Sequence, residues 1–141
     1  MNQLIFETIQ NLSKFTFVKS FVLFLSYGFP YIFSILLATW AFLGPRKFFN
    51  FSLIFITSSF TWLCSVLLKN IFQIARPILE NPIVLETGYS FPSSHAAVSM
   101  AAATVVFYFD KVWGSVFIIA SVLIGISRVV LGVHYPLAIC L

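Results

Sequence analysis

Three short polar fragments interrupt an otherwise apolar chain. The first runs from Lys69 to Arg76-Pro77, the second is the tetrapeptide at residues 92–95, Pro-Ser-Ser-His, and the third runs from Ser127-Arg128 to His134. Only 9% of the residues are charged, yet these fragments hold both histidines and three of the eight lysines and arginines. Basic side chains bind anions, and two histidines can supply a nucleophile and a proton donor. The fragments therefore predict an anion-binding catalytic site.

A phosphoryl group is the anion that these side chains suit. Charge on its three equatorial oxygens must be held while the entering and leaving atoms line up. Lys69, Arg76 and Arg128 offer that positive charge, and an arginine fork binds two oxygens at once. The fragment with Ser93 opens an apolar stretch, where the free N–H groups of a helix start also favour an anion. One histidine would attack phosphorus and the other would protonate the leaving oxygen, without a metal or another cofactor.

The rest of the chain predicts a membrane protein that these fragments serve. The 141 residues are 60% hydrophobic and their mean hydropathy is +1.02. A membrane-crossing helix needs roughly 20 apolar residues. We expect one all-α domain over residues 1–141, a helical bundle whose four membrane helices are listed here by residue number: 18–43, 48–68, 93–109 and 112–133.

Two segments lie outside these helices. Residues 1–17 place Ile5 and Ile9 on one helical face opposite polar side chains, which predicts an interfacial helix in the membrane plane, with a polar unstructured terminus as the alternative. Residues 76–92 contain three prolines, one glycine and two glutamates, so we expect an extramembranous loop there. Small residues from Ala96 to Thr104 allow close helix packing and place that helix at the centre of the bundle.

Four crossings bring all three fragments to one membrane surface. Outside the fragments, three basic residues (Arg46, Lys47 and Lys111) lie on the opposite side and two (Lys14 and Lys19) on the fragment side. Cytoplasmic loops carry the excess of lysine and arginine, so the fragments are expected to face outward. The chain has no basic stripe typical of nucleic-acid binding, and its two cysteines show no spacing that would hold a metal.

The fragments resemble the signature of the type 2 phosphatidic-acid phosphatase (PAP2) superfamily. That signature is lysine, six residues and Arg-Pro; then Pro-Ser-Gly-His; then Ser-Arg, five residues, His, three residues and Asp. The matching positions appear here in the same order over residues 69–138. The resemblance implies that His134 is the nucleophile that forms a phosphohistidine and that His95 is the general acid. It also implies a set of phosphate-binding residues: Lys69, Arg76, Ser93, Ser94 and Arg128.

Residues 1–68 show a looser resemblance to small bacterial undecaprenyl-diphosphate phosphatases. The shared features are the amphipathic start, two close membrane helices and the basic pair Arg46-Lys47 between them. The resemblance implies a metal-independent lipid phosphatase of the cell-wall pathway, in a bacterial plasma membrane, with its site facing outward. Its substrate would be a polyprenyl diphosphate or a related phospholipid, and the chain would need no nucleic-acid partner.

Two departures from the family signature leave a second reading open. Ser94 stands where glycine is commonest, and Ala138 stands where the family has the aspartate that orients the nucleophilic histidine. We expect the final membrane helix of the family to be missing after Leu141. The chain is therefore predicted to be a PAP2-type phosphatase whose activity Ala138 and the missing helix could impair; the alternative is an inactive relative that only binds phosphorylated lipid or a membrane partner.

Overall fold

The computed structural model describes residues 16–77, 84 and 86–139. Every regular element in these ranges is helical, so the predicted all-α membrane fold is confirmed. The elements are α2 (Thr16–Leu23), the π-helix η1 (Phe24–Gly28), α3 (Phe29–Leu43), α4 (Lys47–Phe72), α5 (Ser94–Phe109), α6 (Lys111–Val130) and the 3₁₀ helix η2 (Pro136–Ala138). The interfacial helix expected at residues 1–17 falls almost entirely outside the described residues, as does any helix after Leu141.

Three of the helices are long and apolar enough to cross a membrane: Phe17–Leu43, Lys47–Phe72 and Lys111–Val130. The fourth predicted membrane helix corresponds to the shorter apolar helix Ser94–Phe109. The second span runs four residues further than residue 68, because Lys69 extends the last turn of α4 and is not the start of the loop. The fourth span, expected to reach residue 133, ends at Val130 instead.

Gly132 explains this early end of α6. Its φ is +75°, a left-handed conformation that glycine adopts without steric cost. The N–H of Val133 donates to the carbonyl of Arg128 at 3.3 Å, and the N–H of Gly132 donates to the carbonyl of Val129 at 2.9 Å. This pair of bonds is the Schellman arrangement that closes a helix C-terminus. The chain consequently turns out of α6 just before His134.

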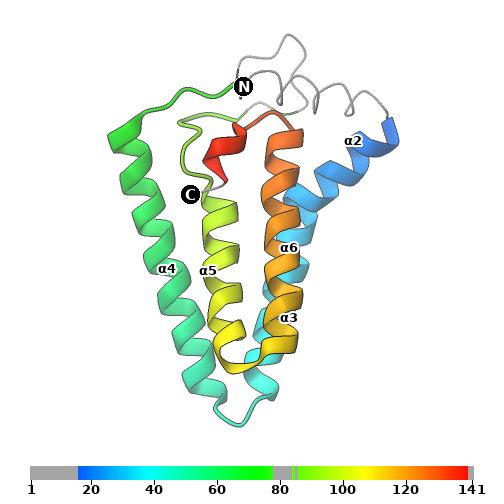
Figure 1. Cartoon of the computed structure of the whole chain (residues 1–141), viewed down its shortest axis with the longest axis vertical. Helices are drawn as coiled ribbons and strands as arrows, with labels where there is room; N and C mark the ends of the chain where they lie inside the picture. Colours follow the sequence, from blue (N-terminus) through cyan, green and yellow to red (C-terminus); the bar gives the residue numbers. More distant parts are fainter. Residues whose placement is uncertain (1–15, 78–83, 85, 140–141) are drawn as a thin grey trace.

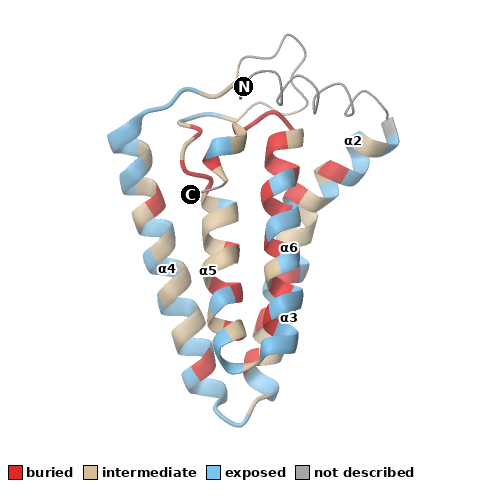
Figure 2. Ribbon diagram, in the orientation of Figure 1, coloured by how far each residue is buried: buried red, intermediate tan, exposed pale blue. Residues whose placement is uncertain are grey.

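The four long helices stand side by side, with α5 between α4 and α6 (Figure 1). The packed interior lies along the contact of α3, α5 and α6, where much of the ribbon in Figure 2 is coloured as buried; it comprises Phe33, Leu37, Ala102, Ala103, Val106, Phe117 and Ile124. The small side chains of α5 let its neighbours approach closely. Large apolar side chains on the outside of α4 are exposed, as expected of a lipid-facing surface.

The first membrane helix carries a π-helical turn in its upper half. Pro30 has no N–H to donate to the carbonyl of Ser26, four residues earlier. The N–H of Phe29 bonds to the carbonyl of Phe24, five residues earlier, which is the π-helical pattern. Such single-turn widenings are common at functional sites because they change the direction of nearby side chains. Here the turn places Ser26, fully buried, and Tyr27 beside the end of α6.

The connection between α5 and α6 lies at the opposite end of the bundle. Asp110 caps α6, because its Oδ1 accepts the N–H groups of Val112 and Trp113, each at 3.0 Å. Gly114 allows the two helices to meet: a Cβ on it would stand 2.1 Å from the Cα of Phe107. This tight turn fixes the register of α5 against α6 and so the relative position of the fragments at their other ends.

Candidate active site

All three polar fragments meet at one end of the bundle. Residues 73–77 and 86–93 of the loop, the start of α5 and the described segment after α6 lie together there, opposite the 44–46 turn and Asp110 (Figure 1). The topology predicted from four crossings therefore matches the arrangement of the described helices. The elements that position the site are α4, the start of α5, the end of α6 and the π-helical turn of the first membrane helix.

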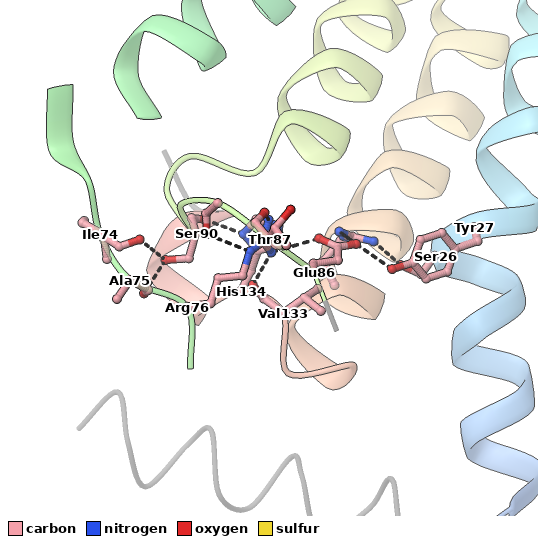
Figure 3. Close-up of polar contacts among 12 residues, drawn as sticks. Ser26, Tyr27, Ile74, Ala75, Arg76, Glu86, Thr87, Ser90, Val133 and His134 are labelled. Atoms are coloured by element: carbon pink, nitrogen blue, oxygen red, sulfur yellow. Dashed lines mark hydrogen bonds and ion pairs between the residues drawn. The ribbon is translucent and has the colours of Figure 1, made fainter. Parts of the chain in front are cut away.

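Glu86 lies at the centre of this cluster, between the two arginines of the site (Figure 3). Its Oε2 pairs with Nη1 of Arg76 at 2.9 Å, and its Oε1 pairs with Nη2 of Arg128. The hydroxyl of Tyr27 donates to the same Oε1 at 2.5 Å. Burial would raise the pKa of Glu86, but these hydrogen bonds and both arginine charges outweigh it and lower the pKa to about 2. The carboxylate is therefore ionised at every physiological pH.

Arg128 is the most deeply buried charge of the described chain, with 1% of its surface exposed. Its Nη1 donates to the hydroxyl of Ser26 at 2.9 Å, and its guanidinium lies 5.3 Å from the ring centre of Tyr27. The Nε–H has no hydrogen-bond partner among the described residues. A buried donor without a partner is costly, so this edge of the guanidinium is suited to a ligand oxygen.

Arg76 is held by backbone carbonyls as well as by Glu86. Its Nη1 donates to the carbonyl of Val133 at 2.8 Å, and its Nε donates to the carbonyl of Gly88 at 3.2 Å. The first bond joins the loop before α5 to the segment after α6. Arg76 thus fastens the first fragment to the third and keeps its guanidinium in the cluster.

His134 is buried, with 1% of its surface exposed, and its Nδ1 bonds to the backbone carbonyl of Ser90. A carbonyl can only accept a hydrogen bond, so Nδ1 must carry the proton and the lone pair must lie on Nε2. Burial lowers the pKa of His134 to about 3, aided by the charges of Arg128 and Arg76 and opposed by the Ser90 bond. The imidazole is therefore neutral near pH 7, with an unprotonated nitrogen available for attack.

The second fragment forms the start of α5. The hydroxyls of Ser94 and Ser65 share a hydrogen bond of 2.7 Å, which ties this start to α4. Ser93 is 1% exposed, and its Oγ has no hydrogen-bond partner in the described ranges. His95 is exposed, within electrostatic range of Arg128, Glu86, Lys69 and Arg76. Lys69 lies in the last turn of α4 and interacts electrostatically with Arg76, Glu86 and Arg128.

An apolar cavity of about 460 Å³ opens beside His95 and Ser94. Its walls are mainly α3, α4 and α5, with Ile124 of α6 and with Phe33, Leu37 and Phe55 among the lining side chains. It extends the polar cluster into the membrane-embedded part of the bundle. An amphiphile with an anionic head and an apolar tail would match both regions.

Ala138 does not stand where a helix continuing past His134 would place it. Residues 136–138 form a separate 3₁₀ turn after α6 has ended, and Ala138 is buried there. Its carbonyl accepts the N–H of Ser93 at 3.0 Å, so it contributes a backbone contact to the second fragment. The family signature has an aspartate to orient the histidine. In this chain Nδ1 of His134 bonds to the carbonyl of Ser90.

Four contributors to the cluster were not anticipated from the sequence: Ser26, Tyr27, Glu86 and Ser90. A partial signal exists for Ser26 and Tyr27, since they form a polar pair just before Pro30 in an apolar run. The residue pattern places Glu86 only within the extramembranous loop at residues 76–92. Ser90 acts through its carbonyl, and a backbone group leaves no trace in the residue pattern.

Among the described residues, no group of three histidine, cysteine, aspartate or glutamate side chains is placed to bind a metal ion. Within the described part of the chain, the charged groups that gather at the site are three basic side chains and one carboxylate. The net positive charge of such a pocket suits an oxyanion.

Comparisons with known proteins agree with this geometry. The family model of the PAP2 superfamily matches residues 28–141. The bacitracin transport permease protein BcrC of Bacillus licheniformis is 36% identical over 61 residues, which are 43% of this chain and 30% of that protein. The crystal structure of a transmembrane PAP2 type phosphatidylglycerolphosphate phosphatase from Bacillus subtilis superposes with a TM-score of 0.55 and 23% identity, over 98% of this chain and 85% of the other. The chain thus spans less than a third of the curated relative, and the solved structure supports the fold.

Proposed function

Because the chain belongs to the PAP2 superfamily, we propose that it hydrolyses a phosphate from a phosphorylated membrane lipid, with a polyprenyl diphosphate such as undecaprenyl diphosphate as the preferred substrate. The observation that carries the proposal is the bond from His134 Nδ1 to Ser90, which leaves a neutral imidazole with a free Nε2 beside two arginines. The relatives support it as well, since the superposed protein is described as a phosphatidylglycerolphosphate phosphatase.

In the proposed reaction, Nε2 of His134 attacks the terminal phosphorus while the bond from phosphorus to the bridging oxygen breaks. His95 donates its proton to that oxygen, and polyprenyl phosphate leaves. Arg76, Arg128 and Lys69 hold the charge on the phosphoryl oxygens, together with Ser93 and Ser94. Neutral His95 then takes a proton from water, which attacks the phosphohistidine and releases inorganic phosphate. No step calls for a metal ion.

The apolar cavity beside His95 suits the lipid part of such a substrate. It is lined by α3, α4 and α5 and lies within the membrane-spanning part of the helices. A polyprenyl chain would enter it while the diphosphate reached the arginines. Because the walls offer apolar surface and few polar groups, they would select for an apolar tail without defining its length.

The decisive experiment is the release of phosphate from undecaprenyl diphosphate by the purified chain, with and without a chelator. We expect release that the chelator leaves unchanged and that His134→Ala abolishes. Arg46→Lys is a suitable control, because Arg46 is exposed at the opposite end of the bundle. Release that depends on magnesium, or that survives in His134→Ala, would contradict the histidine mechanism.

The second candidate is a protein that binds phosphorylated lipid without hydrolysing it. Two observations favour it. Ala138 offers no carboxylate, and Glu86 already pairs with both arginines. Binding of undecaprenyl diphosphate without release of phosphate, under conditions where the chain stays folded, would establish this alternative. Phosphate release in the assay above would exclude it.

A further inference from the structure

We propose that the carboxylate of Glu86 is an internal competitor of the substrate: it occupies the oxyanion place between Arg76 and Arg128 in the ligand-free protein and must leave before a phosphoryl group binds. The inference rests on the proposed function, since it concerns the same pocket. It assigns to Glu86 a control over phosphate affinity that neither the family signature nor the roles of the histidines supply.

The contacts of Glu86 are those that an oxyanion would make. One carboxylate oxygen pairs with Arg76 and the other with Arg128, so the group bridges the two guanidinium ions. Tyr27 donates a third hydrogen bond. A phosphoryl group that used both arginines would need the same donors, and two anions cannot share them.

The carboxylate does not satisfy every hydrogen-bond donor around this oxyanion position. It takes Nη2 of Arg128 and leaves Nε, on the same edge of the guanidinium, without a partner among the described residues. Ser93 Oγ is likewise buried and unpaired within the described part of the chain. Glutamate has two oxygens, whereas a terminal phosphoryl group has three free oxygens that can accept several donors at once. A phosphoryl group can therefore satisfy donors that Glu86 leaves unused.

Both arginines keep other partners when Glu86 leaves. Arg128 is held through Nη1 by the hydroxyl of Ser26, and Arg76 is held through Nη1 by the carbonyl of Val133. The positions of the two guanidinium groups therefore do not depend on Glu86. What Glu86 provides is a counter-charge, because a buried arginine without an anion is strongly destabilising.

The competition does not fade with pH. Glu86 stays ionised well below neutrality, so acid does not release it from the arginines in the physiological range. Other groups that act on the cluster are Lys69, His95 and His134. Displacement by another anion is then the route by which the two arginines become free.

The test is the binding of orthovanadate to the purified, detergent-solubilised chain, measured by the shift of its thermal unfolding midpoint and by calorimetry. Glu86→Gln keeps the size of the side chain and removes the competing charge. We expect its Kd for vanadate to be at least ten-fold lower than that of the unmodified chain, and its unfolding midpoint without anion to be lower. Tyr27→Phe leaves the charge in place but removes one bond to it, so its Kd should fall by about two-fold to five-fold.

Asp110→Asn is the matched control, because it removes one negative charge at the opposite end and asparagine still caps α6. Its vanadate affinity should equal that of the unmodified chain. Weaker or equal binding in both Glu86→Gln and Tyr27→Phe would overturn the inference and leave the phosphate pocket standing. Absence of vanadate binding in every variant would overturn the pocket itself, and the inference with it. If Glu86→Gln does not fold, Tyr27→Phe alone decides.

Discussion

His134 donates its Nδ1 proton to the backbone carbonyl of Ser90, and this bond orients the imidazole without any carboxylate. The lone pair then lies on Nε2, the nitrogen that attacks phosphorus in the proposed reaction. In a serine-protease triad an aspartate has this orienting role. A peptide carbonyl carries no charge, so it fixes the tautomer and direction of the ring but stabilises a positive imidazole less than an aspartate does.

Ser90→Ala tests whether that carbonyl positions His134. The Ser90 hydroxyl donates to the carbonyls of Ile74 and Ala75, at 3.2 and 3.0 Å, and only its N–H remains as an anchor in the variant. We expect kcat for phosphate release to fall about ten-fold, or about 1.4 kcal/mol of barrier, while KM changes little. Ser115→Ala, on the exposed part of α6 far from the site, is the control. A rise in KM with kcat unchanged would indicate that Ser90 shapes substrate binding and does not position the nucleophile.

Ala138→Asp restores the carboxylate of the family signature, but the structure predicts no gain from it. Nδ1 of His134 already has an acceptor, and Ala138 is buried in the 3₁₀ turn. An added carboxylate would be desolvated there without an assigned partner, which is destabilising. We expect unchanged or lower kcat and a lower unfolding midpoint, with Ala138→Ser as a milder comparison. A rise of ten-fold or more in kcat would show that the Ser90 carbonyl is an inadequate substitute.

Arg128→Lys should weaken anion binding although it keeps the positive charge. Lysine lacks the edge formed by Nε and Nη2, and it loses the geometry of the bond to Ser26. The Kd for orthovanadate should rise by at least about ten-fold, as expected when a bidentate contact becomes a point charge. Measured beside Arg46→Lys, which should bind vanadate normally, the change isolates the fork from the charge. Equal affinity in the two variants would remove Arg128 from the pocket.

The stability of the fold should decrease in mild acid because of His134. Its pKa is about 3 in the folded chain and about 6.5 in an unfolded one, so the unfolded state alone takes up a proton between these values. The contribution of His134 to the free energy of unfolding is therefore complete above pH 6.5 and is lost as the pH falls toward 3. Glu86, with its pKa lowered to about 2, adds a loss only below its ordinary value near 4.5.

The unfolding midpoint of the purified chain should accordingly fall between pH 7 and pH 5, where Glu86 stays ionised in both states. His134→Gln has no titrating group at this position and retains a donor for Ser90. Its midpoint should fall less over the same interval. An identical fall in the variant would show that another group is responsible.

The helices and their shared end could be predicted from sequence because both follow from simple counts. Uncharged runs of about 20 residues indicate membrane helices, and an even number of crossings returns the chain to the starting side. The end of α6 was misjudged because apolar residues continue to Val133, whereas the left-handed conformation of Gly132 stops the helix earlier. Gly132 is therefore the residue that marks the end of α6, which the hydrophobicity of the segment does not show.

The partners of the motif residues were beyond reach for a different reason. Arg128 and Ser26 are 102 positions apart, and their contact depends on how the first membrane helix widens near Pro30 and packs on α6. Glu86 is 42 positions from Arg128, in a loop whose path no periodicity describes. Sequence spacing identifies groups that share a helix face, but it does not identify the counter-ion that crosses between elements.

The orientation in the membrane is the last prediction. We expect the end that holds the site to face outward, since Arg46, Lys47 and Lys111 lie at the other end and cytoplasmic segments favour basic residues. Cysteine is best introduced at Thr87 and at Pro45, because both positions are exposed and neither change removes a charge. The background carries Cys64→Ser and Cys140→Ser.

An impermeant maleimide added to intact cells should label Thr87→Cys and leave Pro45→Cys unlabelled until the membrane is permeabilised. The Thr87 contact with Arg76 is made by its backbone carbonyl, so the substitution leaves that bond available. Labelling of both variants after permeabilisation shows that each thiol is reactive. Labelling of Pro45→Cys alone in intact cells would reverse the orientation, and the lipid headgroup would then be hydrolysed at the inner leaflet.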